Sequence, residues 1–430
     1  MKHVLIIGAG FAGLACAKAL ANKKKFTVTV IDRTNHHLFQ PLLYQVASAS
    51  LTAPDIAQSI RQILCKAKNI TVLMDEIIAI DPAARKATGR SGTVLDFDYL
   101  VLASGARTGY FGNDHWAAHT LCLKSLADAQ DIRRRILTCL EKAEMTKDAA
   151  ECKRLMTIAI VGGGPTGVEL AGSFADLTHR SLQSNYRNID TARLSIILIE
   201  GSERILEAYS SEQSQYAKSR LESLGVVVMV NTRVTEVTAG KLHLKSGEIL
   251  EAESIIWAAG VQASPLAAQI SAASDRSGRI TPLPDLSVPG FPFVFVAGDL
   301  VNMRDSKDQV VPGIAPAAMQ MGDHIGRLLL EEARLETTSF ADRKTNLRAN
   351  FRYRDKGFMA IIGKNHAVVK SGKTELQGFV AWLMWLFIHI LFLVGFRNKL
   401  AVLLGWAFAY IKDNPSARVI INPPNPQTGP

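Results

Sequence analysis

Cysteine is scarce in this sequence, with five residues among 430. Their number is odd and no two of them form a C-x-x-C pair, which argues against a disulfide framework and favours a reducing compartment. A metal site also lacks support. His36 and His37 are adjacent, so their side chains cannot share one face of a strand. We therefore expect no bound metal.

Acidic residues are outnumbered, 39 against 49 Lys and Arg, which gives a formal net charge of +10. Such a balance favours an anionic partner. No nucleic-acid recognition motif accompanies it, so we expect a lipid surface rather than nucleic acid. Several basic residues precede the most apolar stretch of the chain, and we expect them to bind anionic lipid at the membrane surface. They are Arg343, Lys344, Arg348, Arg352, Arg354, Lys356, Lys364, Lys370 and Lys373.

Two glycine-rich motifs are present, each directly after an apolar run. The first is Gly8-Ala9-Gly10-Phe11-Ala12-Gly13 after residues 3–7, and the second is Gly162-Gly163-Gly164-Pro165-Thr166-Gly167 after residues 157–161. A glycine-rich turn between strand and helix lets the backbone approach a pyrophosphate, whose charge lies at the helix N-terminus. Two such sites in one chain predict two dinucleotides, a flavin and a nicotinamide.

An acidic residue at the end of the following strand strengthens each assignment. Asp32 ends the run 28–31 at a spacing that suits a βαβ unit, and Glu200 ends the run 195–199. The second spacing is longer, which predicts an extension near 179–190. Either carboxylate can accept hydrogen bonds from a ribose.

The length and the alternation of elements predict a doubly wound α/β fold with two Rossmann-like dinucleotide-binding domains. We place a discontinuous FAD-binding domain at 1–118 and 281–340, an NADH-binding domain with a helical lead-in at 119–280, and a membrane-anchoring region at 341–430. Residues 35–52 are expected to form a loop. Strands are expected at 70–74, 99–103, 226–230, 234–237, 242–244, 251–257 and 293–299, the last closed by Gly298-Asp299, and helix at 123–152.

Residues 379–396 form an apolar block in which His389 is the only strongly polar side chain, and a second block follows at 400–411. The length of the first permits a membrane-spanning helix. Trp382, Trp385 and Trp406 suit the interfacial zone of a bilayer. We favour a monotopic attachment, and a spanning helix or a buried core or dimer helix stays open. The N-terminal segment imitates a signal peptide, but its removal would destroy the first motif, so we expect no cleavage.

Taken together, the motifs resemble those of type II NADH dehydrogenases, the single-subunit, non-proton-pumping NADH:quinone oxidoreductases among the two-dinucleotide flavoprotein reductases. The resemblance runs nearly end to end. It rests on IIGAGFAGL at the start, HHLFQPLLYQVA at 36–47, LVLASGA at 100–106, IVGGGPTGVELAG at 160–172, WAAGV at 257–261, VAGD at 296–299, GIAPAAMQMG at 313–322 and YRDKGFMAIIGKNHAVV at 353–369.

The resemblance implies roles for the matching residues. FAD, bound non-covalently, would be held by Gly8, Gly10, Gly13, Asp32, Ala103, Ser104, Gly105 and Asp299. NADH would be held by Gly162, Gly164, Gly167, Glu200, Ala259 and Gly260. Glu200 would disfavour NADPH, with Arg204 near enough to soften that preference. Glu169 and Gln320 would serve catalysis, Glu169 near the nicotinamide and flavin and Gln320 at the quinone.

The sequence departs from the family pattern at two places. Pro316 replaces the first glutamine of an A-Q-x-A-x-Q segment, and Gln377 stands where some members carry a lysine. No role is therefore carried over to either position.

The implied activity is transfer of a hydride from NADH to FAD and then of two electrons to a membrane quinone, without proton pumping. We expect the protein at the cytoplasmic face of the inner membrane, with a homodimer left open. A sulfide:quinone oxidoreductase is one alternative, although it needs redox-active cysteines. A membrane-tethered NAD(H)-binding protein without turnover is another.

Overall fold

The computed structural model describes residues 1–178, 182, 185–270, 272–305, 308–334, 348–412 and 418–420. Contacts divide the chain into two compact units. Unit 1 comprises Met1–His37, Gln58–Arg107 and Val261–Lys356, and unit 2 comprises Leu38–Ala57, Thr108–Gly260 and Gly357–Pro430. Both units are therefore discontinuous in sequence. The three-domain division expected from the sequence stays a prediction.

Unit 1 is built on a six-stranded sheet in the order β19-β20-β9-β1-β2-β5, parallel except for β19. The strands are β1 (Lys2–Ile7), β2 (Phe26–Asp32), β5 (Ile70–Met74), β9 (Tyr99–Leu102), β19 (Ser287–Val288) and β20 (Phe291–Val296). Val4, Leu5 and Ile6 are fully buried, as is typical of a central strand in a parallel sheet that is covered on both faces, and Ile77, Ile80 and Ala87 belong to the same core.

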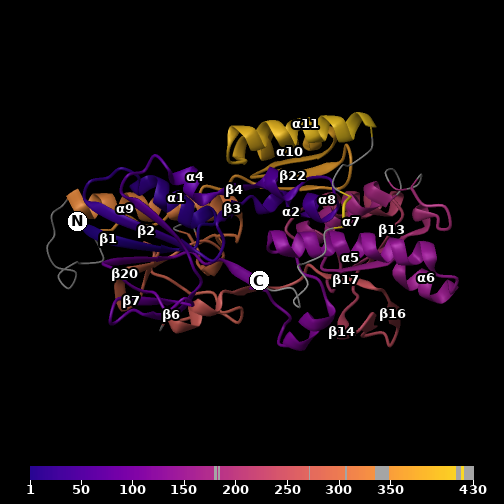
Figure 1. The fold of residues 1–430 in the computed structure, drawn as a ribbon, viewed down its shortest axis with the longest axis horizontal. Coiled ribbons are helices and arrows are strands. Elements are labelled where there is room, and N and C mark those ends of the chain that lie inside the picture. The colour runs from indigo at the N-terminus through magenta and orange to yellow at the C-terminus, as the bar shows by residue number, and fades with distance from the viewer. Residues whose placement is uncertain are drawn as a thin grey trace, which may run out of the picture. The chain divides into compact units, whose positions relative to one another are not determined.

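Two helices of unit 1, α1 (Phe11–Leu20) and α9 (Ala315–Arg334), lie side by side (Figure 1). They approach so closely that a Cβ added at Gly322 would overlap the carbonyl oxygen of Ala12. The other elements of this unit are a short helix α4 (Ile60–Leu64), an antiparallel sheet of β6 (Ile77–Asp81), β7 (Lys86–Gly89) and β8 (Val94–Asp96), a strand β18 (Val261–Ala263), and 3-10 turns at Pro265–Gln269 and Gly298–Leu300. Strands β3 (His36–Leu38), β4 (Ala57–Ser59) and β10 (Ala106–Thr108) lie where the chain passes from one unit to the other.

Unit 2 repeats the nucleotide-binding topology with a parallel sheet in the order β13-β12-β11-β17. Its strands are β11 (Thr157–Val161), β12 (Ser195–Ile199), β13 (Val226–Met229) and β17 (Ser254–Trp257). In both sheets the glycine-rich motif follows a central strand. In unit 1 this strand is β1, between β2 and β9, and in unit 2 it is β11, between β12 and β17. The doubly wound α/β prediction is confirmed.

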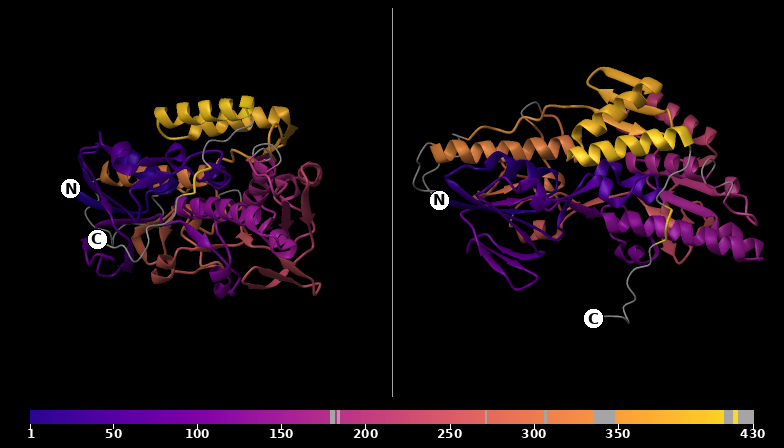
Figure 2. Two further views of the ribbon diagram at one scale, coloured as in Figure 1. Left: turned by 45° about the vertical axis from the view of Figure 1, so that its right-hand side comes forward. Right: turned by 45° about the horizontal axis from the view of Figure 1, so that its top comes forward.

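The remaining elements of unit 2 are helices and two three-stranded antiparallel sheets (Figure 2). Its longer helices are α5 (Leu126–Met145), α6 (Ala149–Leu155), α7 (Pro165–Asp176) and α8 (Ser211–Ser223), and its short ones are α2 (Leu43–Ala47), α3 (Ala53–Ile56) and 3-10 turns at Gln40–Leu42, Asp114–His119 and Thr191–Arg193. Antiparallel sheets are formed by β14 (Val234–Thr238), β15 (Lys241–Leu244) and β16 (Ile249–Glu251), and by β21 (Phe358–Ile361), β22 (Ala367–Ser371) and β23 (Thr374–Gly378).

Two local predictions were wrong. Residues 35–52 are not all loop, since a 3-10 turn begins at Gln40 and continues into α2, whose five residues are all buried. Burial against the unit stabilises a helix too short to form alone. The single strand expected at 251–257 is two, β16 and β17, which belong to different sheets. The extension expected near 179–190 lies partly outside the described residues.

The apolar C-terminal region forms two helices of unit 2, α10 (Phe379–Phe392) and α11 (Phe396–Lys412) (Figure 1). Helix α10 packs against β22 and β23, and α11 packs against α3 and α10. The 14 residues of α10 would extend about 21 Å, short of a hydrocarbon core of about 30 Å. Across the described part of the chain, no helix combines the length and the apolar character that crossing a bilayer requires.

Candidate functional site

The first glycine-rich loop of unit 1 joins β1 to α1 in a conformation that excludes side chains at two positions. Gly8 has φ +98°, and a Cβ there would overlap the carbonyl oxygen of Ala103. A Cβ at Gly13 would overlap the carbonyl oxygen of Gly8. At Gly10, in contrast, a Cβ would meet nothing within 4 Å. The loop therefore packs tightly inward and leaves open space at the N-terminus of α1, as a pyrophosphate requires.

The acid expected at the end of β2 contacts this loop directly. Asp32 accepts hydrogen bonds from the backbone N–H of Ala9 at 2.7 Å and, through its other oxygen, from the N–H and hydroxyl of Thr34 at 2.7 and 2.8 Å. Beside the loop, the buried hydroxyl oxygen of Ser104 has no protein partner. A dinucleotide hydroxyl or phosphate would satisfy it. These residues fit FAD.

Two further predicted residues of unit 1 lie near α9. Asp299 sits in the 3-10 turn after β20, and a Cβ at Gly313 would lie 3.6 Å from its carboxylate oxygen. The Gln320 amide donates to the carbonyl oxygen of Arg354 at 3.0 Å and accepts from its N–H at 2.9 Å. Gln320 thus holds the segment after 348 against α9, and its predicted contact with quinone remains a proposal.

The second loop, in unit 2, has the same design. Gly162 has φ +116°, with Ala258 and Ala259 against the position of a Cβ at 2.8–3.0 Å. A Cβ at Gly167 would overlap the carbonyl oxygen of Gly162, whereas one at Gly164 would meet nothing within 4 Å. Gly260 packs against the carbonyl oxygen of Gly109. The predicted nucleotide-binding residues of this unit, including Ala259, therefore lie together around the C-terminal ends of its parallel strands.

Glu200 repeats the role of Asp32. It accepts from the N–H of Gly163 at 2.6 Å and from that of Ser202 at 2.8 Å. Arg204 is directed elsewhere, because it donates to the carbonyl oxygen of Glu207 at 3.0 Å and to the hydroxyl of Ser211 at 3.2 Å. These contacts weaken the expectation that Arg204 would receive the extra phosphate of NADPH.

A largely apolar cavity of about 620 Å³ lies wholly within unit 2. Its walls come from α2, α7, the end of β21 and both C-terminal helices. Few of the lining side chains are polar, and they include Tyr44, Gln45, Glu169, Ser173 and Lys364. Such a cavity suits a flat, apolar ligand that carries a few hydrogen-bonding groups.

One wall of the cavity is a hydrogen-bonded chain that the sequence did not reveal. Trp406 donates to the amide oxygen of Gln45 at 2.7 Å, and Gln45 donates to the hydroxyl oxygen of Tyr44 at 3.0 Å. Tyr44 and Gln45 belong to the specific segment HLFQPLLYQVA, so that motif was the signal that could have identified them. Their connection to Trp406, which is far away in sequence, required the structure.

Glu169 lines the same cavity from the first turn and a half of α7. Burial raises the pKa of its carboxyl to about 8, against the opposing effect of the Ile361 N–H. The side chain is therefore largely a neutral carboxylic acid at pH 7 and can donate a proton or a hydrogen bond into the cavity.

The C-terminal helices are buried on one face only. Ala381, Trp385 and His389 are enclosed by protein, and Trp385 stacks on His389 with ring centroids 4.0 Å apart. The prediction that Trp385 lies at a membrane interface was wrong, because its side chain fills the unit's core. Burial lowers the pKa of His389 to about 4, so this residue is neutral.

The opposite face of these helices is exposed and apolar. It defines an apolar helical surface of Phe379, Val380, Leu383, Met384, Phe387, Leu391, Phe396, Leu400, Leu403, Leu404 and Phe408. Phe387 is 67% and Phe396 82% exposed. A contiguous patch of this kind is typical of a protein or membrane interface.

The predicted basic cluster is only partly available to lipid. Arg348 is buried, where it pairs with Asp285 at 3.0 Å and with Glu332 at 2.6 Å, so its assignment to a lipid-facing set was wrong. Lys364 donates to the carbonyl oxygen of Tyr410 at 2.9 Å and lies over its ring. Arg343 and Lys344 lie outside the described residues.

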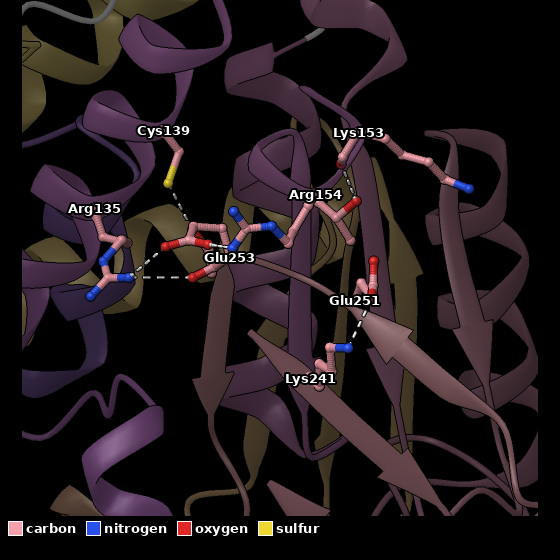
Figure 3. A network of polar contacts seen from close by, with 9 residues as sticks. Arg135, Cys139, Lys153, Arg154, Lys241, Glu251 and Glu253 are labelled. Atoms are coloured by element: carbon pink, nitrogen blue, oxygen red, sulfur yellow. Dashed lines mark hydrogen bonds and ion pairs between the residues drawn. The ribbon is translucent and has the colours of Figure 1, made fainter. Parts of the chain in front are cut away.

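A second polar network lies at the other end of the sheet in unit 2 (Figure 3). Glu253, just before β17, pairs with Arg154 of α6 and with Arg135 of α5 at 3.4 Å. Cys139 contacts the hydroxyl of Ser254 at 3.8 Å. Because ligands of such sheets bind at the carboxyl ends of the strands, this network fastens helices and is not part of the site.

All five cysteines are free thiols. Cys16 is fully buried, and burial raises the pKa of its thiol to about 12. A protonated, enclosed thiol is a poor nucleophile. Nothing in these contacts supplies the redox-active cysteines that sulfide oxidation needs.

The chain is similar to known proteins over most of its length. The model of the pyridine nucleotide-disulphide oxidoreductase family matches residues 2–322. Two relatives from Mycobacterium tuberculosis, the type II NADH:quinone oxidoreductases Ndh and NdhA, are 38% and 40% identical over 95% of this chain and 88% and 87% of their own. The structure of NDH2 from Plasmodium falciparum in complex with NADH has a TM-score of 0.86 at 21% identity, covering 98% of this chain and all of that one.

Proposed function

Since the chain belongs to the type II NADH:quinone oxidoreductases of the pyridine nucleotide-disulphide oxidoreductase family, we propose that it is a membrane-attached flavoenzyme that oxidises NADH and reduces a quinone. The observation that carries this proposal is the repeated loop design, with one dinucleotide site in each unit.

FAD, when bound, supplies the group that accepts a hydride from NADH and passes two electrons to the quinone. Gly8, Gly10 and Gly13 would hold its pyrophosphate, and Asp32 its adenosine ribose. The residues after β9, which are Ala103, Ser104 and Gly105, and Asp299 would hold the rest of the cofactor. The protein's contribution is binding and orientation.

NADH would bind the second loop, with its pyrophosphate at Gly162, Gly164 and Gly167 and the adenosine ribose at Glu200. Small residues at Ala259 and Gly260 would leave room for the nicotinamide end. A carboxylate at the ribose repels an additional phosphate, which supports a preference for NADH over NADPH.

We assign the cavity of unit 2 to the quinone. Its apolar walls suit the ring and isoprenoid chain, and Glu169 would supply a proton to the reduced ring. Gln320 is a second candidate for quinone contact, on unit 1.

The apolar helical surface would lie in the membrane and admit quinone from lipid. A monotopic attachment to the cytoplasmic face of the inner membrane would give the site access to NADH. Arg397 and Lys399, beside this surface at the start of α11, would add attraction to anionic headgroups, each worth about 1 kcal/mol.

The decisive experiment is an anaerobic titration of the purified protein with NADH, followed by its absorption spectrum. We expect a yellow protein whose flavin bands bleach with NADH and return when a soluble quinone analogue is added. A protein that is colourless and takes up no FAD would overturn the proposal. Bleaching by sulfide but not by NADH would favour the sulfide:quinone reaction, and NADH binding without turnover would favour a sensor.

A further inference from the structure

The middle residue of each glycine-rich loop is held through its N–H by an acid. Ala9 donates to Asp32 at 2.7 Å, and Gly163 donates to Glu200 at 2.6 Å. In both loops, therefore, a carboxylate fixes the N–H side of this peptide group.

The two loops differ in how the carbonyl group of that residue is held. In unit 2 the Gly163 carbonyl oxygen accepts from the backbone N–H of Leu206 at 2.8 Å. In unit 1 the Ala9 carbonyl oxygen contacts Nδ1 of His37 at 2.9 Å. Because a carbonyl oxygen can only accept, Nδ1 carries the proton. A side chain therefore does in the first loop what the main chain does in the second.

His37 is enclosed at this position. It is 3% exposed, and its ring meets that of Phe11, the first residue of α1, edge-on at 5.2 Å. Its Nε2 atom is buried and has no hydrogen-bond partner in the protein. Such an atom is costly unless a ligand or an ordered water pairs with it.

The charges around His37 favour the neutral ring. Burial lowers the pKa of His37, and Lys18 on α1 and the adjacent His36 lower it further, while the Ala9 carbonyl and Asp32 oppose them. With the proton on Nδ1, Nε2 of the neutral ring offers a lone pair that accepts a hydrogen bond.

We propose that His37 is a positioning residue for FAD: its Nδ1–H orients the Ala9 peptide of the pyrophosphate loop, and its Nε2 accepts a hydrogen bond from a hydroxyl group of the bound dinucleotide. This inference rests on the proposed FAD site. It assigns a function to one residue of a histidine pair that shows no metal-binding geometry.

The test measures FAD affinity of the full-length protein after removal of its flavin, by titration with FAD at pH 7.5. His37→Phe keeps an aromatic ring but removes both nitrogens, so the bond to the loop and the bond to the dinucleotide are lost together, and we expect at least about tenfold weaker FAD binding. His37→Asn places an amide N–H near the position of Nδ1, so we expect it to restore only the part of the loss that comes from the bond to the loop. NADH affinity, which depends on the other loop, should not change.

His36→Asn is the matched control, since the His36 ring contacts the Asn35 side chain through Nδ1 at 3.1 Å, whereas the ring of His37 holds the loop. The thermal stability of each flavin-free variant separates a folding defect from a binding defect. In the wild type, FAD affinity should fall as the pH is lowered from 7.5, because protonation removes the lone pair of Nε2. This fall should be absent in His37→Phe.

An unchanged FAD affinity in His37→Phe would overturn the inference. Tighter FAD binding by the wild type at pH 5 would also overturn it, because it would mean that Nε2–H donates to phosphate. Either result leaves the proposed function intact. Failure of the wild-type protein to bind FAD at all would instead overturn the proposed function.

Discussion

Three glycines of each loop differ in what a methyl group would meet, and this difference separates folding from binding. Gly13 and Gly167 face backbone oxygen, so a side chain there displaces the main chain. Gly10 and Gly164 face open space at a helix N-terminus, where the phosphates of the proposed ligands would lie. The motif therefore meets two physical requirements: close packing of the helix on the strand at the third glycine, and free space for a ligand at the second.

Gly13→Ala should lower stability and abolish FAD binding together, because α1 must move away from β1. Gly10→Ala, its matched control, should melt within about 2 °C of the wild type in the flavin-free state yet bind FAD at least tenfold more weakly. Thermal melts and FAD titration check both. Equal loss of stability in the two variants would contradict this distinction.

Glu169→Gln should slow quinone reduction by about a hundredfold, the scale of losing one proton donor, while NADH still reduces the flavin. The wild-type rate of quinone reduction should fall as pH rises through about 8, where the carboxyl loses its proton, and the variant should not show this fall. Stopped-flow measurement of each half-reaction checks this. A slowed NADH half-reaction would place Glu169 at the nicotinamide instead.

The same carboxyl links stability to pH. Its pKa is raised in the folded protein, so the stability present below about pH 4.5 is lost progressively as pH rises towards 8. Compared with the wild type, Glu169→Gln should therefore gain stability between pH 5 and pH 9, on the order of a few kcal/mol. The exposed Glu212→Gln is the control and should gain nothing.

At the scale of elements, α10 and α11 show how one apolar sequence serves two purposes. Every fourth residue of α10, from Ala381 through Trp385 to His389, is buried, and the other face remains exposed and equally apolar. A helix in water would carry polar residues there. This uniform composition supports the proposed arrangement, in which protein would cover one face and lipid the other.

Phe387→Ser with Phe396→Ser should reduce binding to vesicles of mixed neutral and anionic lipid by at least tenfold, since two large apolar side chains no longer enter the bilayer. Because both side chains are exposed, thermal stability should be unchanged. The control is Met145→Ser, an equally exposed site at the end of α5. Vesicle flotation checks the result, and unchanged flotation would place the membrane surface elsewhere.

A buried ion-pair cluster joins elements of unit 1 that are distant in sequence. Arg348 pairs with Asp285 and with Glu332 of α9 and donates to the Pro292 carbonyl oxygen in β20, while Tyr99 donates to Glu332 at 2.7 Å. Arg348→Met should destabilise the protein by about 3–5 kcal/mol, because two carboxylates stay buried without their cation. The exposed Arg352→Met should cost less than about 0.5 kcal/mol. Denaturant unfolding compares the two variants.

At the scale of the whole molecule, the described residues contain one buried histidine in α10 and no chain of titratable groups along the C-terminal helices. Neutral His389 cannot relay protons by itself. In proteoliposomes, NADH oxidation by a quinone should therefore proceed without acidifying the lumen. A lumenal pH change that follows turnover and disappears with a protonophore would contradict this expectation.

The sequence by itself determined the α/β class, both dinucleotide loops and the acids Asp32 and Glu200, because these features depend on local chemistry: a turn that needs glycine, an apolar strand before it and an acid after the next strand. Only the tertiary structure decided which residues form the cavity, that Arg348 and Trp385 are buried, and that His37 holds the first loop. Those properties arise from contacts between segments far apart in the chain, such as Gln45 with Trp406, and no local pattern encodes which distant partner a side chain meets.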